Sequence, residues 1–136
     1  MAGTANSIIT PQTPKSAVVN TATAQATFPP TTTPSNTVLL LTAGANGGRL
    51  TRLQACPQET ATANNVQLYR SSNAGTTKFY ANGVTLTATV SATAAGTPAD
   101  FGYSDDNPLI LAANEALYVA VGIAKSVNFI AEWADY

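Results

Sequence analysis

The chain of 136 residues contains no histidine and a single cysteine, Cys56. Catalysis by an imidazole and zinc sites built from several Cys and His ligands are therefore excluded by composition. Charged residues make up only 10% of the chain, against about 25% in an ordinary soluble domain. With six Lys and Arg residues, a net charge of −1 and no basic cluster, the chain lacks the cations that displace counterions from nucleic-acid phosphates. We therefore expect no nucleic-acid partner.

Long apolar stretches are also missing. The segment Met1–Thr10 has neither a positively charged start nor a long apolar run, which argues against a signal peptide. The most apolar window, Leu109–Ile123, is interrupted by Asn114 and Glu115, so we expect no membrane-spanning helix and no membrane partner. Because Cys56 has no second cysteine to pair with, we expect the protein to be made in a reducing cytoplasm. Export by another route stays open.

Two small residues dominate what is present. Alanine and threonine account for 25 and 21 of the 136 positions, and hydrophobic residues make up 45% of the chain. That hydrophobic content is too high for a disordered chain, and the length suits one domain. A core built largely from alanine and threonine is thin, so we expect stabilisation by self-association or by docking onto a larger structure.

Alternation of apolar and polar side chains predicts β-strands. In Thr85–Val90 every second residue is threonine and the others are apolar. In Val127–Trp133 every second residue, from Val127 to Trp133, is apolar and falls on one face. Both patterns have the two-residue period of a strand. The apolar runs Thr37–Leu41 and Leu109–Leu111 predict strands buried on both faces. Further strands are predicted at Val18–Phe28, Gly48–Cys56, Val66–Arg70, Thr77–Tyr80 and Leu117–Val121. Besides the inward faces of these strands, we expect the core to contain Phe28, Leu53, Leu68 and Phe79.

Turn signals separate these runs. Ser72–Gly75 divides two of them, and Asn82-Gly83 predicts a tight turn. No helical stripe is present, although Ala61–Asn65 has room for one helical turn. Short strands spaced about 8–12 residues apart are typical of a sandwich or barrel. We therefore predict an all-β fold, a single antiparallel β-sandwich that is jelly-roll-like.

The first 36 residues differ in composition from the rest. Phe28–Asn36 is rich in proline and threonine. The start of the chain contains Pro11 and Pro14, and its only large apolar residues after Met1 are Ile8 and Ile9. Proline has no N–H for a ladder and biases the residue before it toward extended geometry. We predict an extended N-terminal arm over residues 1–36, with an early strand inside it, and a β-sandwich domain over residues 37–136.

Two local motifs contain residue types that could carry chemistry. Asp105 and Asp106 could serve as a cation site or as an acid pair, but adjacent residues of an extended chain point to opposite sides, and the following Asn107-Pro108 favours a solvated turn. The glycine-rich segment Gly44–Arg49 lacks the Lys and Ser/Thr of a phosphate-binding loop and leads into a predicted strand. We interpret it as a loop between strands.

The arginines Arg49, Arg52 and Arg70 are half of all basic side chains. One hypothesis pairs them within the chain, with Glu59, Glu115 or Glu132 as partners. The other places them in contacts between chains, because arginine suits partly buried bidentate pairing.

The C-terminus ends in two aromatic residues, Trp133 and Tyr136. Chain ends fray unless they are tied down, so we expect this strand to be docked, either in its own sheet or against a neighbouring subunit.

These features together resemble small virion structural proteins of tailed bacteriophages. The resemblance lies in the neutral Ala/Thr/Gly-rich composition, the Pro/Thr arm, and the segments Gly48–Leu53 and Leu109–Val119. It covers residues 37–136 and is strongest to the β-sandwich proteins that decorate or cement the outside of the capsid. It implies a protein without a catalytic, cofactor or metal site, made in the host cytoplasm and resident in the virion.

The same resemblance implies the major capsid protein as partner and self-association as a homotrimer. The arm is best suited to reach over the capsid lattice, because an extended segment spans about 3 Å per residue. The candidate interface residues are Ile8, Ile9, Pro11, Pro14, Arg49, Arg52, Arg70, Trp133 and Tyr136.

Other functions stay open. A phage tail or fibre-tip module shares the composition. A carbohydrate-binding β-sandwich would need an exposed aromatic row or a calcium site, for which Tyr103–Asp106 is the candidate. A pilin or adhesin subunit would normally carry a secretion signal. An enzyme would need a Ser or Asp constellation that the sequence does not display.

Overall fold

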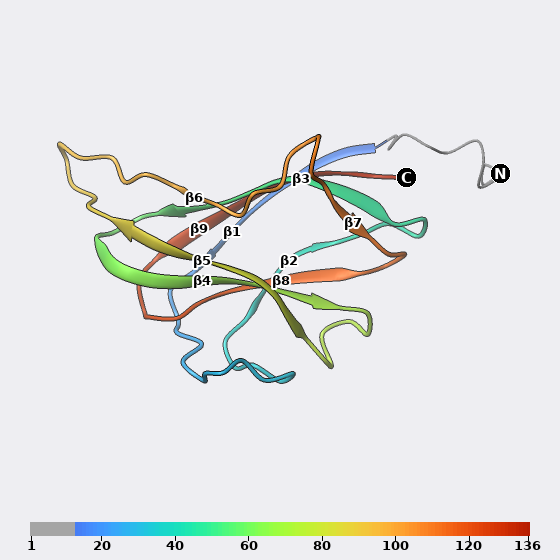
Figure 1. Ribbon diagram of the computed structural model, residues 1–136, viewed down its shortest axis with the longest axis horizontal. Coiled ribbons are helices and arrows are strands. Elements are labelled where there is room, and N and C mark those ends of the chain that lie inside the picture. Colours follow the sequence, from blue (N-terminus) through green and yellow to red (C-terminus); the bar gives the residue numbers. More distant parts are fainter. Residues whose placement is uncertain (1–12) are drawn as a thin grey trace.

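The computed structural model describes residues 13–136, which form nine β-strands. The strands build two antiparallel sheets packed face to face, so the predicted all-β sandwich is confirmed (Figure 1). No helix long and apolar enough to cross a membrane occurs in this part of the chain. The strands are β1 (Thr13–Thr21), β2 (Val38–Thr42), β3 (Gly48–Pro57), β4 (Ala61–Ser71), β5 (Phe79–Ala88), β6 (Ala99–Asp100), β7 (Leu109–Leu111), β8 (Ala116–Val121) and β9 (Val127–Asp135).

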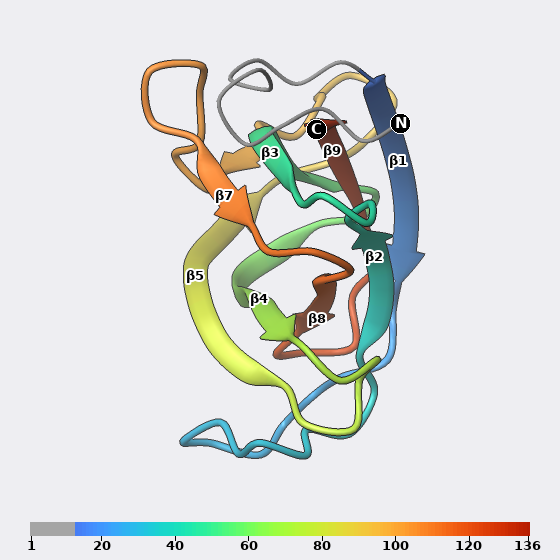
Figure 2. The same ribbon diagram turned by 90° about the vertical axis from the view of Figure 1, so that its right-hand side faces the viewer.

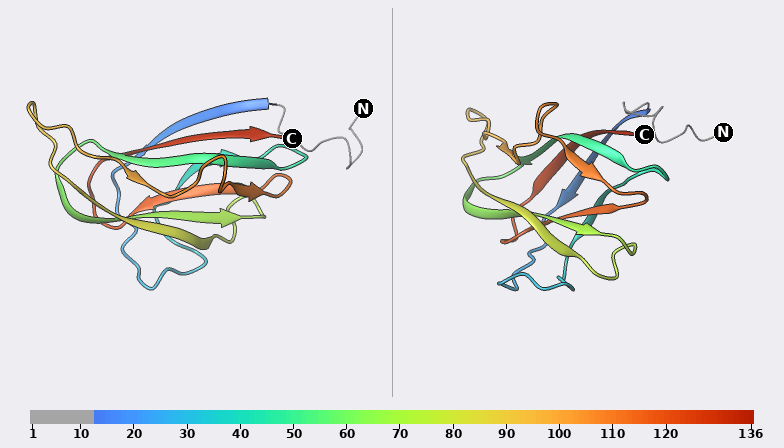
Figure 3. Two further views of the ribbon diagram at one scale, coloured as in Figure 1. Left: turned by 45° about the horizontal axis from the view of Figure 1, so that its top comes forward. Right: turned by 45° about the vertical axis from the view of Figure 1, so that its right-hand side comes forward.

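The first sheet has the order β1–β9–β3–β6, with β7 also paired to β3, and the second sheet has the order β2–β8–β4–β5. Figure 3 shows the two layers from two further directions. The C-terminal strand β9 lies between β1 and β3 and pairs with both. The prediction that the C-terminal strand docks in its own sheet is therefore confirmed.

Alternating side chains of both sheets meet in the core, as the sequence pattern predicted. Leu86 and Ala88 of β5 are buried, whereas the threonines between and before them are exposed. Leu53 and Leu68, also expected inside, are fully buried. The inward residues of β9 are Val127, Phe129, Ala131 and Trp133.

A β-bulge at Thr51 shapes the first sheet. The register between β3 and β9 shifts by one residue there. Leu50 and Leu53 are three positions apart and would lie on opposite faces of a regular strand, yet both are fully buried because the bulge inserts an extra residue between them. The same shift leaves Arg49 and Arg52 together on the outer face of the sheet.

The predicted tight turn at Asn82-Gly83 is wrong. Both residues lie inside β5, which pairs with β4 on either side of them. The side-chain amide of Asn82 donates hydrogen bonds to the carbonyl of Phe101 (3.1 Å) and to the hydroxyl of Tyr103 (3.2 Å). These long-range contacts and the ladder with β4 outweigh the local turn preference.

Several expectations about burial are also corrected. The prediction that β2 and β7 are buried on both faces is wrong, because nothing in residues 13–136 covers their outward side chains: Leu39 and Ile110 are 47% and 55% exposed. Phe28 and Phe79 were expected in the core but are 46% and 58% exposed, because one lies in a loop and the other begins an edge strand. Ala61–Asn65 belongs to β4 rather than to a helical turn.

The early strand predicted within the N-terminal arm is β1. It begins at Thr13, before the predicted start at Val18, and it pairs with β9 over all nine of its residues without a register shift. Pro14 lies in this edge strand, where a residue without an N–H is tolerated. Residues 13–21 are thus part of the sandwich, while the candidate interface residues Ile8, Ile9 and Pro11 lie outside the described residues.

The segment between β1 and β2, residues 22–37, crosses the outer face of the second sheet and is called the strap (Figure 1). The N–H of Gln25 donates to the carbonyl of Val121 (2.7 Å), and its side-chain amide donates to the hydroxyl of Tyr69 (3.2 Å). Gln25 and Tyr69 are both fully buried. Further along the strap, the carbonyl of Thr32 accepts from the N–H of Lys78 (2.9 Å). The strap therefore buries the middle of this outer face around Tyr69, while Leu39 and Tyr80 on its two edge strands stay exposed.

Candidate functional site

The outer face of the first sheet carries three of the six described residues that the sequence marked as an interface, namely Pro14, Arg49 and Arg52. Side chains of β1, β9 and β3 that lie side by side form cross-strand rows on this face, and β7 extends the first row with Ile110. The rows are Pro14–Ala134–Arg49, Ser16–Glu132–Arg52, Val18–Ile130–Gln54 and Asn20–Asn128–Cys56. No segment of residues 13–136 crosses this face as the strap crosses the second sheet, and it carries exposed apolar side chains, with Val18 64% exposed.

One end of this face is hollowed into an open depression of about 590 Å³. Charged side chains of both signs line it together with small and apolar residues. The lining residues are Pro14, Lys15, Ser16, Arg49, Thr51, Asp105, Glu132, Trp133 and Ala134. The depression is therefore a shallow recess in a largely neutral surface.

All six cationic side chains lie in the described part of the chain, and five have a clear partner. Four form ion pairs with carboxylates, and the fifth, Lys78, lies 4.6 Å above the ring of Tyr118. The ion pairs are Lys15–Asp135 (2.8 Å), Arg52–Glu132 (3.0 Å), Lys125–Glu59 (3.6 Å) and Arg70–Glu115. Arg52 and Arg70 thus pair within the chain, with Glu132 and Glu115, as the first hypothesis predicted.

Arg49 differs from the other cations. It has no carboxylate within 4.0 Å among residues 13–136, and its Nη2 donates instead to the backbone carbonyl of Asp105. Its Nε is buried and has no acceptor within the same residues. A guanidinium binds carboxylates in bidentate fashion. Arg49 is therefore the cation of this face whose guanidinium can still bind a carboxylate of another molecule.

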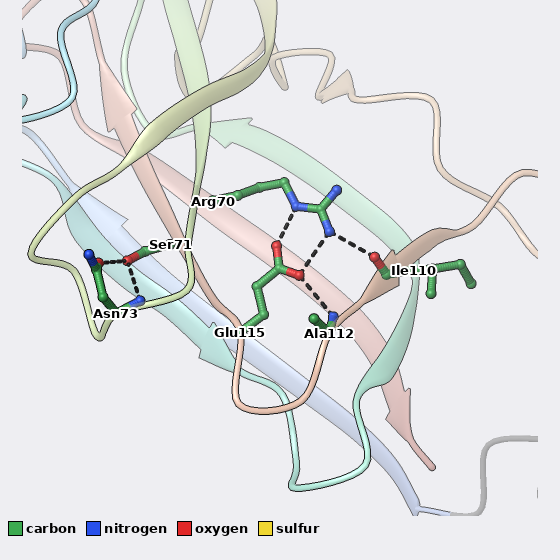
Figure 4. A network of polar contacts seen from close by, with 6 residues as sticks. All are labelled: Arg70, Ser71, Asn73, Ile110, Ala112 and Glu115. Atoms are coloured by element: carbon green, nitrogen blue, oxygen red, sulfur yellow. Dashed lines mark hydrogen bonds and ion pairs between the residues drawn. The ribbon is translucent and has the colours of Figure 1, made fainter. Parts of the chain in front are cut away.

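Arg70 lies away from this face, at the open end of the sandwich, where it joins the two sheets (Figure 4). Its guanidinium binds both carboxylate oxygens of Glu115, with Nη2 to Oε1 at 2.8 Å, and donates to the carbonyl of Ile110 on β7 at 2.8 Å. The N–H of Ala112 donates to Glu115 as well (2.8 Å). Burial opposes ionisation of Glu115, but the hydrogen bonds from Arg70 and Ala112 prevail and lower its pKa. The hydrogen bonds to Glu115 in turn raise the pKa of Arg70.

Asp135 is the second buried carboxylate whose ionisation the fold favours. Burial opposes the charge, but the ion pair with Lys15 and the N–H of Gly44 (3.1 Å) outweigh it and lower the pKa of Asp135. A Cβ atom on Gly48 would lie 3.0 Å from Oδ1 of Asp135. The glycine-rich loop, interpreted from the sequence as a simple connection, is therefore built around this carboxylate.

The structure distributes the predicted interface residues over separate places. Pro14, Arg49 and Trp133 line the depression, and Arg52 lies beside it through its ion pair with Glu132. Tyr136 is held by the hydrogen bond from its N–H to the carbonyl of Gly47 (3.1 Å). Val18 and Ile110 were not predicted as interface residues, because the exposure of an apolar strand residue depends on which segment packs over it.

The segment Tyr103–Asp106 forms a solvated turn. Backbone hydrogen bonds join Ser104 and Asn107 at 3.2 Å, and Asp105 and Asp106 between them are exposed. Within residues 13–136 no three His, Cys, Asp or Glu side chains are grouped so that they could hold a metal ion. Three of the tyrosines form a cross-strand row on the outer face of the second sheet, Tyr80–Tyr69–Tyr118. Tyr69 of this row is buried beneath the strap, whereas Tyr103 lies elsewhere and accepts a hydrogen bond from Asn82.

No protein-family model matches the chain, and no curated protein or solved structure matches it. Function is therefore inferred from the residues and from their arrangement in this fold.

Proposed function

We propose that the protein is a non-enzymatic structural protein of a tailed-phage virion that binds the outer surface of the assembled capsid and reinforces it. Its partner is the major capsid protein, and it reaches the virion after synthesis in the host cytoplasm. The resemblance of the sequence to capsid decoration proteins motivates this proposal, and a β-sandwich with few charges is compatible with it.

The observation that carries the proposal is the outer face of the first sheet. The ion pair of this face, Arg52–Glu132, is satisfied within the chain, and the exposed apolar side chains of Val18 and Ile110 lie among polar residues. Interfaces between proteins combine such apolar contacts with a few arginines that pair with partner carboxylates. Arg49, with no carboxylate partner in the described chain, supplies that arginine. A shell surface that offers a carboxylate beside an apolar patch would complement this face.

The strand order supports the finer interpretation of the fold as jelly-roll-like, which we retain within the proposal. Strands β1 to β4 go alternately to the first and the second sheet, and β8 and β9 again belong to different sheets, each between two earlier strands. Double-sheet jelly rolls are frequent among viral capsid domains.

The test is co-sedimentation of the full chain with capsids assembled from the major capsid protein of the same genome and free of external proteins. The wild-type chain is expected to bind saturably, and Arg49→Gln is expected to bind about tenfold more weakly or worse, because a desolvated partner carboxylate loses its cation. Absence of binding by the wild-type chain at saturation would contradict the proposal.

Arg52→Gln is the matched control. It removes the same charge from the same strand and the same face, but Glu132 already neutralises Arg52 within the chain. It is expected to bind the capsid nearly as well as the wild-type chain. If both variants bound equally poorly, the net charge of the face rather than Arg49 would be responsible.

A further inference from the structure

The first sheet ends in an open edge along β1. Within residues 13–136, β1 pairs with β9 only, and its other side has no strand beside it in the same sheet. Figure 2 shows β1 at the border of the molecule, next to β2 of the other sheet, with which it does not pair. An unpaired strand edge presents a row of N–H and C=O groups that can accept another strand.

The usual protections of an edge strand are scarce here. β1 is nine residues long and has no bulge against β9. Its single charged residue, Lys15, forms an ion pair with Asp135. Pro14 protects only the beginning of the strand, and the following residues Ser16, Ala17 and Val18 are small or apolar. Edge strands that must stay single carry unpaired charges, bulges or central prolines instead.

The position of Pro14 indicates which amides face the open edge. Within sheets, proline occurs where the missing N–H would point away from the neighbouring strand. By the two-residue period of a strand, the amides of Ser16, Val18 and Asn20 point to the same open side. The side chains of these three residues all lie on the outer face of the first sheet.

We propose that β1 pairs antiparallel with β1 of a second copy of this chain, around a twofold axis at Val18. In this register Val18 lies opposite Val18 of the other copy, and Ser16 lies opposite Asn20 in both directions. On the inner face, Ala17 lies opposite Val19, and Lys15 opposite Thr21. Each apolar residue thus meets an apolar one, each polar residue meets a polar one, and no like charges face each other. A pair of this kind exchanges two hydrogen bonds at every second residue.

This contact joins the two first sheets into one continuous sheet and extends their outer faces. It covers Val18, the most exposed large apolar side chain of the described residues, at 64%. Because the contact has twofold symmetry, it predicts dimers rather than the homotrimers that the resemblance implies. It goes beyond the proposed function and does not depend on it, since the dimer forms with or without a capsid.

The first experiment is sedimentation equilibrium of the full chain at increasing concentration. Wild-type protein is expected to form dimers. Val18→Pro removes the outward amide without touching the ladder to β9, and Val18→Lys places two like charges opposite each other, so both are expected to weaken dimerisation tenfold or more. Val18→Thr, which keeps the β-branched shape, is the matched control, and far-UV circular dichroism checks that each variant folds. A wild-type chain that stays monomeric or forms trimers overturns the proposal.

The second experiment tests the register, with Cys56→Ser as the background. Directly opposite residues of a hydrogen-bonded antiparallel pair have Cα atoms about 5.5 Å apart, which lies within the range that a disulfide spans. Val18→Cys is therefore expected to give a disulfide-linked dimer on mild oxidation. Ser16→Cys is the control, because the two copies of residue 16 would be offset by four residues, about 13 Å along the strand. Cross-linking at residue 16 but not at residue 18 overturns the twofold register.

Discussion

Gly83 lies under the ring of Tyr80 in the same strand: a Cβ atom at position 83 would come within 1.9 Å of the Tyr80 hydroxyl oxygen and 3.0 Å of Cζ. The glycine is therefore required for space within a strand rather than for a turn. The Tyr80 ring in turn packs edge-on against Tyr69, with ring centroids 5.7 Å apart. A local signal that resembles a hairpin turn thus marks a close side-chain contact.

Gly83→Ala is expected to destabilise the protein by about 1 kcal/mol, the lower end of the range for overpacking, because the half-exposed Tyr80 ring can move aside. The cost should shrink in a Tyr80→Ala background, because the ring that collides with the new methyl group is absent. Urea denaturation of the wild type, the two single variants and the double variant measures this coupling. Equal costs of Gly83→Ala in both backgrounds would contradict the steric explanation.

Tyr69→Phe is expected to destabilise the protein by about 1–3 kcal/mol, because the buried Oε1 of Gln67 loses its donor and Gln25 loses one of its acceptors. The Tyr69 hydroxyl accepts from Gln25 of the strap (3.2 Å) and donates to Gln67 of β4. Burial raises the pKa of Tyr69, so the group remains a hydrogen-bond donor at neutral pH. In the wild-type structure the backbone N–H of Gln25 donates to the carbonyl of Val121. Hydrogen exchange should show that this backbone amide exchanges faster in the variant.

The control for this variant is Tyr80→Phe. The Tyr80 hydroxyl makes no hydrogen bond within residues 13–136, and the side chain is 45% exposed. It should change the free energy of unfolding little and leave exchange in the strap unaltered. If Tyr69→Phe behaved like this control, the strap would be held by its backbone contacts alone.

Arg70→Met is expected to destabilise the protein by about 2 kcal/mol, because Glu115 would remain buried without its cation. The figure lies below the full cost of breaking a buried pair, since the Arg70 side chain is 34% exposed and water screens it. Adding Glu115→Gln should recover part of the loss, because the unpaired charge disappears. Chemical denaturation of the two single variants and the double variant gives the comparison. A double variant as unstable as the sum of both would exclude a pairwise interaction.

Stability is expected to fall in acid because the pKa values of Asp135 and Glu115 are lowered in the folded protein. The unfolded chain then binds protons at a higher pH than the folded one, so this stabilisation is complete above about pH 5 and is lost as the pH falls through the folded pKa values. Unfolding free energies measured from pH 7 to acid check the direction. Asp135→Asn should flatten this dependence.

Asp106→Asn is the control for the pH series. Asp106 is exposed and forms no ion pair within the described residues. The variant should follow the wild-type curve, and a flattening as large as that of Asp135→Asn would contradict the role given to the Lys15–Asp135 pair.

Much of the fold was predictable because alternation is a local property. The inward positions of β9 and the threonine-lined outer side of β5 follow directly from the two-residue period. The predictions went wrong where packing between layers decides. Leu39 and Ile110 lie in apolar runs that look fully buried, yet nothing in the described chain covers their outward side chains, which reach solvent.

The candidate site was predictable only as a set of residue types. The scarcity of charge made each arginine notable, but the sequence did not distinguish Arg49 from Arg52 and Arg70. Their roles differ because Glu132 and Glu115 are brought to two of them across long stretches of chain, whereas Arg49 meets only the carbonyl of Asp105.

By itself, the sequence determined the all-β class, the inward faces of the regular strands and the nearly neutral surface, since composition and period are carried by the residues themselves. The tertiary structure alone decided the bulge at Thr51 that puts Arg49 and Arg52 on one face, the strap over Tyr69 and the open edge of β1. These features arise from the order in which strands pair, and that order depends on contacts between residues far apart in the chain.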